Sequence, residues 1–124
     1  MIGTETTELG KSVLIVDPSE DNREVLGTAL RRRGLQILEA TEVQQGLQLA
    51  RKHQPEVIVL DLETVTADDA KVQSQYDAET SSRDGSLVVL GTAKRENLSE
   101  KRQVVAKPYH YAPLIRTIEE LASR

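Results

Sequence analysis

Apolar residues gather in short unbroken runs that recur along the chain. The most continuous runs occupy residues 13–16, 57–60 and 87–90, and they are rich in β-branched side chains. Runs of this kind are typical of strands buried on both faces of a parallel sheet. Residues 35–40 and 104–106 continue the pattern with shorter apolar stretches. The sequence therefore predicts five strands.

Segments in which apolar residues recur at helical spacing lie between most of these runs. Residues 22–33 predict a helix that ends at Gly34, residues 43–53 predict another, and a last helix begins near Ala112. Thr41 and Gln44 are expected to form a capping box before the second of these helices. The expected buried positions are Val25, Leu26, Ala29 and Leu30 in the first, Val43, Leu47 and Ala50 in the second, and Leu114, Ile115, Ile118 and Leu121 in the last. Residues 67–82 have only a thin apolar stripe, so we expect a poorly packed or mobile segment there.

Alternating strands and helices predict one α/β domain. With right-handed crossovers the strands build a flavodoxin-like, doubly wound five-stranded parallel sheet in the order 2-1-3-4-5. A domain over residues 11–124 fits the length of 124 residues, and the polar residues 1–10 predict a flexible leader. No apolar run is long enough to span a membrane.

Polar side chains follow four of the predicted strands: Asp17, Asp61, Thr92 and Lys107. The carboxyl ends of parallel strands share one edge of a sheet, where open α/β folds bind their ligands. We therefore expect these four residues to lie together. Asp61 is the centre of this candidate site because it ends the most apolar strand.

Composition excludes several functions. The net charge is −4 and only three residues are aromatic, which argues against a nucleic-acid interface. The chain has no cysteine, so thiol chemistry and thiolate metal ligands are excluded, and the composition favours a cytoplasmic protein.

The ordered set Ile15-Val16-Asp17, Val59-Leu60-Asp61, Gly91-Thr92-Ala93 and Ala106-Lys107-Pro108 resembles the receiver domains of two-component response regulators. The resemblance covers residues 11–122. It implies a phosphorelay domain rather than an enzyme, with a histidine kinase or phosphotransfer protein as donor and an output protein or a second copy of the chain as partner. Asp61 would be the phosphoacceptor, Thr92 the switch hydroxyl and Lys107 the phosphoryl cation, with a cis Lys107–Pro108 bond. Mg²⁺ would be held by Asp17, Asp61 and the Glu63 backbone carbonyl, with Glu20 as a further candidate.

The chain also departs from the family pattern. Pro18 stands where a second acid is usual, so we expect weak Mg²⁺ binding. Val104 replaces a usual aromatic, and the interval from Thr92 to Lys107 leaves room only for a shortened fourth helix, with an irregular segment from Lys94 to Gln103 that exposes apolar surface to a partner.

These departures keep a second interpretation open, a pseudo-receiver that docks partners without phosphorylation. A small flavodoxin-like enzyme or FMN carrier is disfavoured, because the first strand lacks a phosphate-binding loop and the chain has no Trp or Phe.

Overall fold

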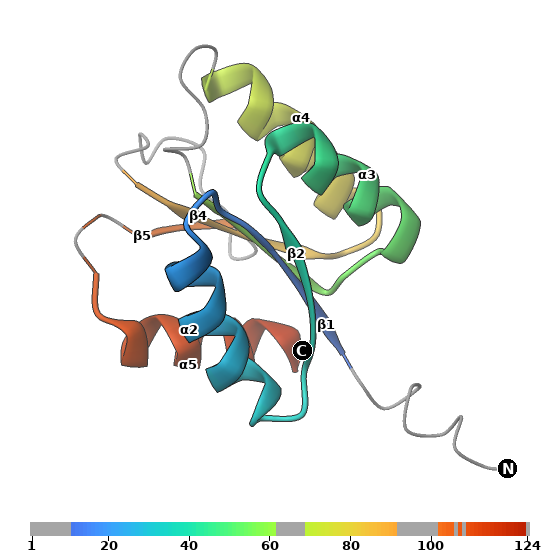
Figure 1. Ribbon diagram of the computed structural model, residues 1–124. Helices are drawn as coiled ribbons and strands as arrows, with labels where there is room; N and C mark the ends of the chain where they lie inside the picture. The colour runs from blue at the N-terminus through green and yellow to red at the C-terminus, as the bar shows by residue number, and fades with distance from the viewer. Residues whose placement is uncertain (1–10, 62–68, 92–101, 106, 108, 124) are drawn as a thin grey trace, which may run out of the picture.

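Five short strands form one parallel sheet in the order β2-β1-β3-β4-β5, with helices on both sides of it (Figure 1). The computed structural model describes residues 11–61, 69–91, 102–105, 107 and 109–123. The strands are β1 (Ser12–Val16), β2 (Gln36–Ala40), β3 (Val57–Asp61), β4 (Ser86–Leu90) and β5 (Arg102–Val105). The predicted fold class and strand order are confirmed. The last strand begins at Arg102, earlier than the apolar pattern indicated, and so takes in the end of the segment that was expected to be irregular.

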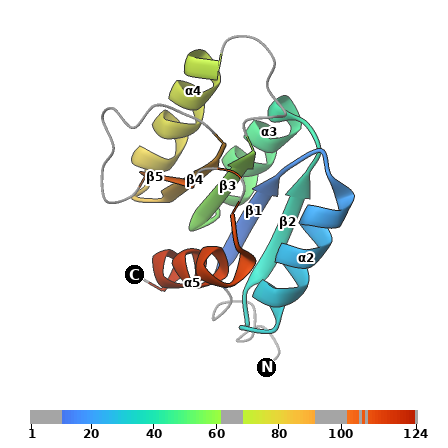
Figure 2. The same ribbon diagram turned by 90° about the vertical axis from the view of Figure 1, so that its left-hand side faces the viewer.

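Helices cover both faces of the sheet. They are α2 (Glu20–Arg31), α3 (Val43–His53), α4 (Asp69–Ser81) and α5 (Tyr111–Ala122). Helices α2 and α5 lie on one face, and α3 and α4 lie on the other (Figure 2). Among the described residues, no helix is long and apolar enough to cross a bilayer.

The core divides according to the alternation of side chains along each strand. In β1, Val13 and Ile15 pack toward α2 and α5, whereas Leu14 and Val16 pack toward α3 and α4. The central strands β1, β3 and β4 are buried on both faces, which explains their continuous apolar runs.

Helix ends differ in detail from the sequence prediction. Ser19 caps α2 by accepting a hydrogen bond from the Asn22 amide at 3.2 Å, so the helix begins at Glu20 rather than Asn22. Val25 is 43% exposed, so its assignment to the buried face was wrong, whereas Leu26 and Leu30 are buried and Ala29 packs against the core. Gly34 has the predicted left-handed backbone, with φ of 87°.

The predicted capping box at Thr41 was also wrong. The N-cap residue of α3 is Glu42, which makes no side-chain capping bond. The Thr41 backbone amide instead donates to Gln45 Oε1 at 3.1 Å. The side chain that accepts the bond from the Thr41 amide is therefore that of Gln45, not that of Gln44.

Helix α4 is better packed than its sequence indicated. Tyr76 is fully buried, and Gln73 and Thr80 are buried beside it. The Tyr76 hydroxyl donates to the Val43 carbonyl oxygen at 2.8 Å, which ties α4 to α3. The expectation of a poorly packed segment was wrong for residues 71–81, because one large side chain, Tyr76, provides contacts that the thin stripe did not suggest.

Several expectations concern parts of the chain outside the described residues. They are the leader at residues 1–10, the shortened helix between β4 and β5, the irregular segment over residues 94–101 and the cis bond at Lys107–Pro108.

Candidate functional site

The register of the sheet brings two acids together at the carboxyl ends of β1 and β3. Val16 pairs with Leu60, so the residues that follow, Asp17 and Asp61, are neighbours across the two strands. Their relative exposures are only 1% and 3%. This is the edge at which open α/β sheets bind ligands.

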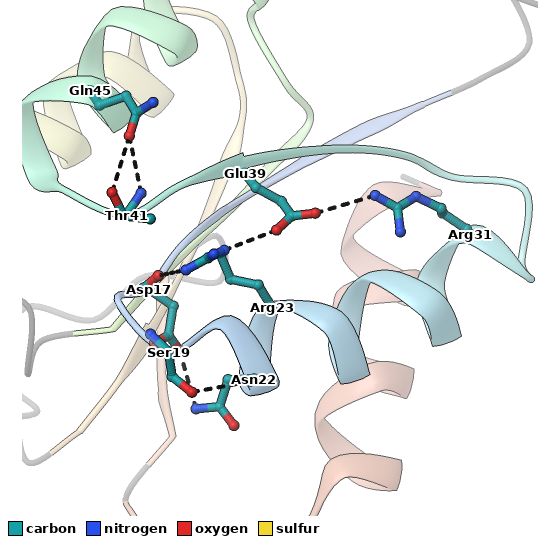
Figure 3. A network of polar contacts seen from close by, with 8 residues as sticks. All are labelled: Asp17, Ser19, Asn22, Arg23, Arg31, Glu39, Thr41 and Gln45. Carbon is teal, nitrogen blue, oxygen red and sulfur yellow. Dashed lines mark hydrogen bonds and ion pairs between the residues drawn. The ribbon is translucent and has the colours of Figure 1, made fainter.

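Asp17 is held by the turn that leads into α2. Its Oδ1 accepts a hydrogen bond from the Ser19 backbone amide at 2.8 Å, and its Oδ2 accepts one from Asn22 Nδ2 at 3.3 Å (Figure 3). The Asp17 carbonyl oxygen accepts a bond from Arg23 Nη1 at 2.7 Å, and Arg23 in turn pairs with Glu39 on β2 at 2.9 Å. Both the side chain and the backbone of Asp17 are therefore fixed.

Lys107 is directed at Asp61. Its Nζ donates to Asp61 Oδ1 at 2.8 Å, and the side chains of the lysine and the acid are 21% and 4% exposed. A charge-assisted hydrogen bond of this length is stronger than a neutral one. The ammonium group therefore neutralises part of the charge of the two acids.

Burial and like charge shape the electrostatics of this site. Burial is the main cause that raises the pKa of Asp17, and the neighbouring Asp61 raises it further, whereas the bond from Ser19 lowers it. Burial also raises the pKa of Tyr109 to about 12, and the neighbouring Tyr111 and Asp17 contribute to this increase. Tyr109 therefore stays protonated near neutral pH. Two adjacent buried carboxylates with one lysine leave an excess of negative charge that favours a further cation.

The donor set fits a weakly held Mg²⁺. This ion prefers oxygen ligands, keeps several waters and is usually held by one or two carboxylates. Asp17 and Asp61 supply two carboxylates, whereas the exposed Pro18 supplies no side-chain oxygen. Within the described part of the chain, no cluster of three or more His, Cys, Asp or Glu side chains is suited to a metal. Water would have to complete much of the coordination.

The structure brings together three of the site residues predicted from sequence, Asp17, Asp61 and Lys107. Thr92 and Glu63 lie outside the described residues. Glu20 is exposed in the first turn of α2, where an acid compensates the positive end of the helix dipole.

Sequence analysis missed three residues that contribute to this site: Asn22, Tyr109 and Tyr111. Asn22 contacts Asp17, and the Tyr111 hydroxyl donates to Asn22 Oδ1. The rings of Tyr109 and Tyr111 meet edge to face with centroids 5.7 Å apart. The sequence carried one signal for the tyrosines: two of the three in the chain come just after Lys107, which was itself expected at this edge of the sheet.

Substitution of Asp17 by asparagine is expected to stabilise the protein at neutral pH. Because the folded-state pKa is raised, the contribution of Asp17 to stability is present below its ordinary pKa of 3.8 and is lost as pH rises through the raised value. Removing the like charge should therefore add about 0.5 to 2 kcal/mol at pH 7, the range common for single stabilising substitutions, and less at pH 4. Urea denaturation across this pH range measures the effect.

The exposed Asp21, substituted by asparagine, is the control for a change of one charge. A Asp17→Asn variant that is less stable than wild type by the same amount at both pH values would contradict the prediction. Loss of the hydrogen bonds from Ser19 and Asn22 would then outweigh relief of the charge pair.

Comparisons with known proteins agree with this geometry. A profile of the response regulator receiver domain matches residues 13–118. The chain is 30% identical over 112 residues to protein PilH of Pseudomonas aeruginosa, covering 86% of this chain and 93% of PilH.

Two solved structures have the same fold. A CheY-like receiver domain protein from Methanospirillum hungatei superposes with a TM-score of 0.73 at 23% identity, covering 91% of this chain and 94% of that one. The receiver domain of sensor histidine kinase PA1611 from Pseudomonas aeruginosa, solved with magnesium coordinated in its active site cleft, gives 0.71 at 18% identity, covering 93% and 99%.

The parallel sheet with acids and a lysine at one edge thus defines a signalling module of two-component systems. The chain belongs to the response regulator receiver domain family.

Proposed function

We propose that this receiver domain accepts a phosphoryl group on Asp61 and thereby switches a protein interaction surface. The contact between Lys107 Nζ and Asp61 Oδ1 at 2.8 Å, beside the buried Asp17, carries the proposal. A carboxylate nucleophile, a fixed ammonium group and a second acid are the groups that phosphoryl transfer to an aspartate needs. We assign this role to the domain at residues 11–124 in the cytoplasm, with residues 1–10 as its leader.

The proposed donor is the phosphohistidine of a histidine kinase or a phosphotransfer protein. One oxygen of Asp61 forms a bond to phosphorus, the bond between phosphorus and the donor imidazole nitrogen breaks, and the nitrogen keeps the electron pair. The protein supplies position and charge compensation, so it acts as an acceptor rather than as an enzyme that turns over a substrate.

Each neighbouring residue has a part in this step. Lys107 offsets the negative charge on Asp61 and on the incoming phosphoryl oxygens. Asp17 would hold a cation together with Asp61 and the proposed Glu63 carbonyl, with Glu20 as a further candidate. Bound Mg²⁺ would supply additional compensation for the charge that develops on the phosphoryl group. Thr92 is the proposed hydroxyl that contacts the modified aspartate and so moves the output surface.

Pro18 supports a second candidate function. It leaves the site with one carboxylate fewer than the family pattern, which would favour a pseudo-receiver that docks its partner without phosphate. In either case the partner is an output protein or a second copy of the chain, and neither nucleic acid nor membrane is proposed.

Incubation with acetyl phosphate and Mg²⁺ tests the proposal. Mass spectrometry of the intact protein should show one addition of about 80 Da, the mass of a single phosphoryl group. Asp61→Asn should remove the addition. Asp84→Asn, which changes an exposed acid, should retain it, and peptide mapping should place the modification at residue 61.

The pseudo-receiver gives the opposite result. Wild-type protein would then remain unmodified under conditions that label another receiver domain in the same tube, even at high Mg²⁺. Modification of the Asp61→Asn variant to the wild-type level would also overturn the assignment, because the acceptor would be a different residue.

A further inference from the structure

A second chain of polar contacts starts at Asp17 and does not involve Lys107. Asn22 Nδ2 donates to Asp17 Oδ2 at 3.3 Å, and the hydroxyl of Tyr111 donates to Asn22 Oδ1. Asn22 belongs to the first turns of α2, and Tyr111 is the first residue of α5. The two helices share one face of the sheet (Figure 2), so their amino-terminal ends are linked through one amide group.

The chemistry of these groups fixes the direction of the link. An ionised carboxylate only accepts hydrogen bonds, whereas an asparagine side chain has one donor end and one acceptor end. The amide must therefore turn Nδ2 toward Asp17, which leaves Oδ1 to face Tyr111. The carboxylate of Asp17 opposes the flipped amide, in which two oxygens would face each other, and the Tyr111 hydroxyl restrains the amide in this orientation by donating to Oδ1.

The segment after β5 therefore reaches both acids. Lys107 contacts Asp61, and Tyr111 reaches Asp17 through Asn22. Tyr109 packs edge to face against the ring of Tyr111 and restricts the positions that this ring can take. Asp61 is thus in contact with Lys107, and Asp17 is linked through Asn22 to Tyr111, four positions further along the chain.

We infer that Tyr111 is a positioning residue of this site: its hydroxyl orients Asn22, Asn22 holds Asp17, and the state of Asp17 is coupled in return to the amino terminus of α5. The inference extends the proposed function, in which Asp17 is a cation ligand. Such second-layer partners fix the orientation of ligating carboxylates. The effect matters more here because Pro18 leaves Asp17 without an adjacent acid.

Nuclear magnetic resonance of the metal-free protein tests the link without any requirement for phosphorylation. Tyr111→Phe keeps the ring and removes only the hydroxyl, so the Asn22 side-chain amide resonances should shift. Asp17→Asn should perturb the backbone amides at His110 and Tyr111 in the wild-type background, and this perturbation should be absent in the Tyr111→Phe background. Tyr76→Phe makes the same chemical change on the opposite face and should leave the Asn22 resonances unchanged.

Titration with Mg²⁺ alone gives a second readout. Asn22→Ala should weaken binding about tenfold, in line with losses seen for second-layer partners of metal ligands, and Tyr111→Phe, which acts one contact further from the ligand, about threefold. If both act through one link, the double variant should bind no more weakly than Asn22→Ala, whereas independent effects would multiply to about thirtyfold. The Tyr76→Phe control should bind as wild type.

The outcomes separate this inference from the proposed function. Unchanged Asn22 resonances in Tyr111→Phe, or Mg²⁺ effects that multiply, would overturn the inference while leaving phosphorylation of Asp61 intact. A wild-type protein that neither binds Mg²⁺ nor accepts a phosphoryl group would overturn the proposed function, and the resonances of the metal-free protein would still decide whether Tyr111 positions Asn22.

Discussion

Substitution of Tyr76 by alanine is expected to lower the free energy of unfolding by about 3 to 5 kcal/mol, the range typical of truncating a buried aromatic side chain. Tyr76 is fully buried between α3 and α4, and its hydroxyl donates to the Val43 carbonyl oxygen at 2.8 Å. Alanine would leave a large cavity and remove the hydrogen bond that the tyrosine hydroxyl gives to the Val43 carbonyl oxygen. Urea denaturation, with the dependence on urea concentration compared between variants, measures the loss.

Two matched variants separate the contributions to this effect. Tyr76→Phe keeps the ring and should cost only about 1 kcal/mol, the net value of a typical hydrogen bond. Lys71→Ala, at an exposed position of the same helix, should change stability by less than about 0.5 kcal/mol. A Tyr76→Ala variant as stable as Lys71→Ala would show that α4 contributes little to the folded state.

The surroundings of Tyr76 explain why its contribution is large. Gly46 lies against it, and a Cβ at this position would overlap the tyrosine hydroxyl and come within 2.7 Å of Val16 Cγ2. The ring therefore fills a space that only a glycine on α3 leaves open. This contact joins α3 and α4, although neither helical sequence by itself indicates that Gly46 and Tyr76 depend on each other.

The sheet could be predicted from sequence because its central strands are buried on both faces. Continuous apolar runs in β1, β3 and β4 are short and rich in β-branched residues, which favours buried strands over helices, and the direction of parallel strands then brings Asp17, Asp61 and Lys107 to one edge. The placement of these three residues could be predicted from the position at which each strand ends. No contact between side chains was needed to predict their proximity.

Contacts across distant parts of the chain could not be predicted in this way. Asn22 and Tyr111 are 89 residues apart, and neither belongs to a periodic pattern that would indicate a partner. Tyr76 was visible only as one member of the thin apolar stripe over residues 67–82. The prediction for Val25 was wrong because helical spacing alone cannot decide which edge of a wide apolar stripe remains exposed.

Substitution of Pro18 by aspartate is expected to tighten Mg²⁺ binding by about tenfold or more, the scale on which a ligand or its supporting group alters metal affinity. Pro18 is exposed directly after Asp17 at the carboxyl end of β1, so a carboxylate there would join Asp17 and Asp61. The substitution also releases the φ angle that the proline ring fixes. Phosphorylation by acetyl phosphate should become faster at low Mg²⁺ concentration, because more of the protein would hold the cation.

The stability difference between Pro18→Asp and wild type should also change sign when Mg²⁺ is added. Without Mg²⁺, a third carboxylate beside two buried acids should make Pro18→Asp less stable than wild type, since like charges repel. With saturating Mg²⁺ the order should reverse, because a ligand stabilises the folded state according to its affinity. Pro18→Ala releases the backbone without adding charge and should show neither effect. Thermal unfolding with and without Mg²⁺ compares the three proteins, and equal Mg²⁺ affinity in Pro18→Asp and Pro18→Ala would show that residue 18 does not reach the cation.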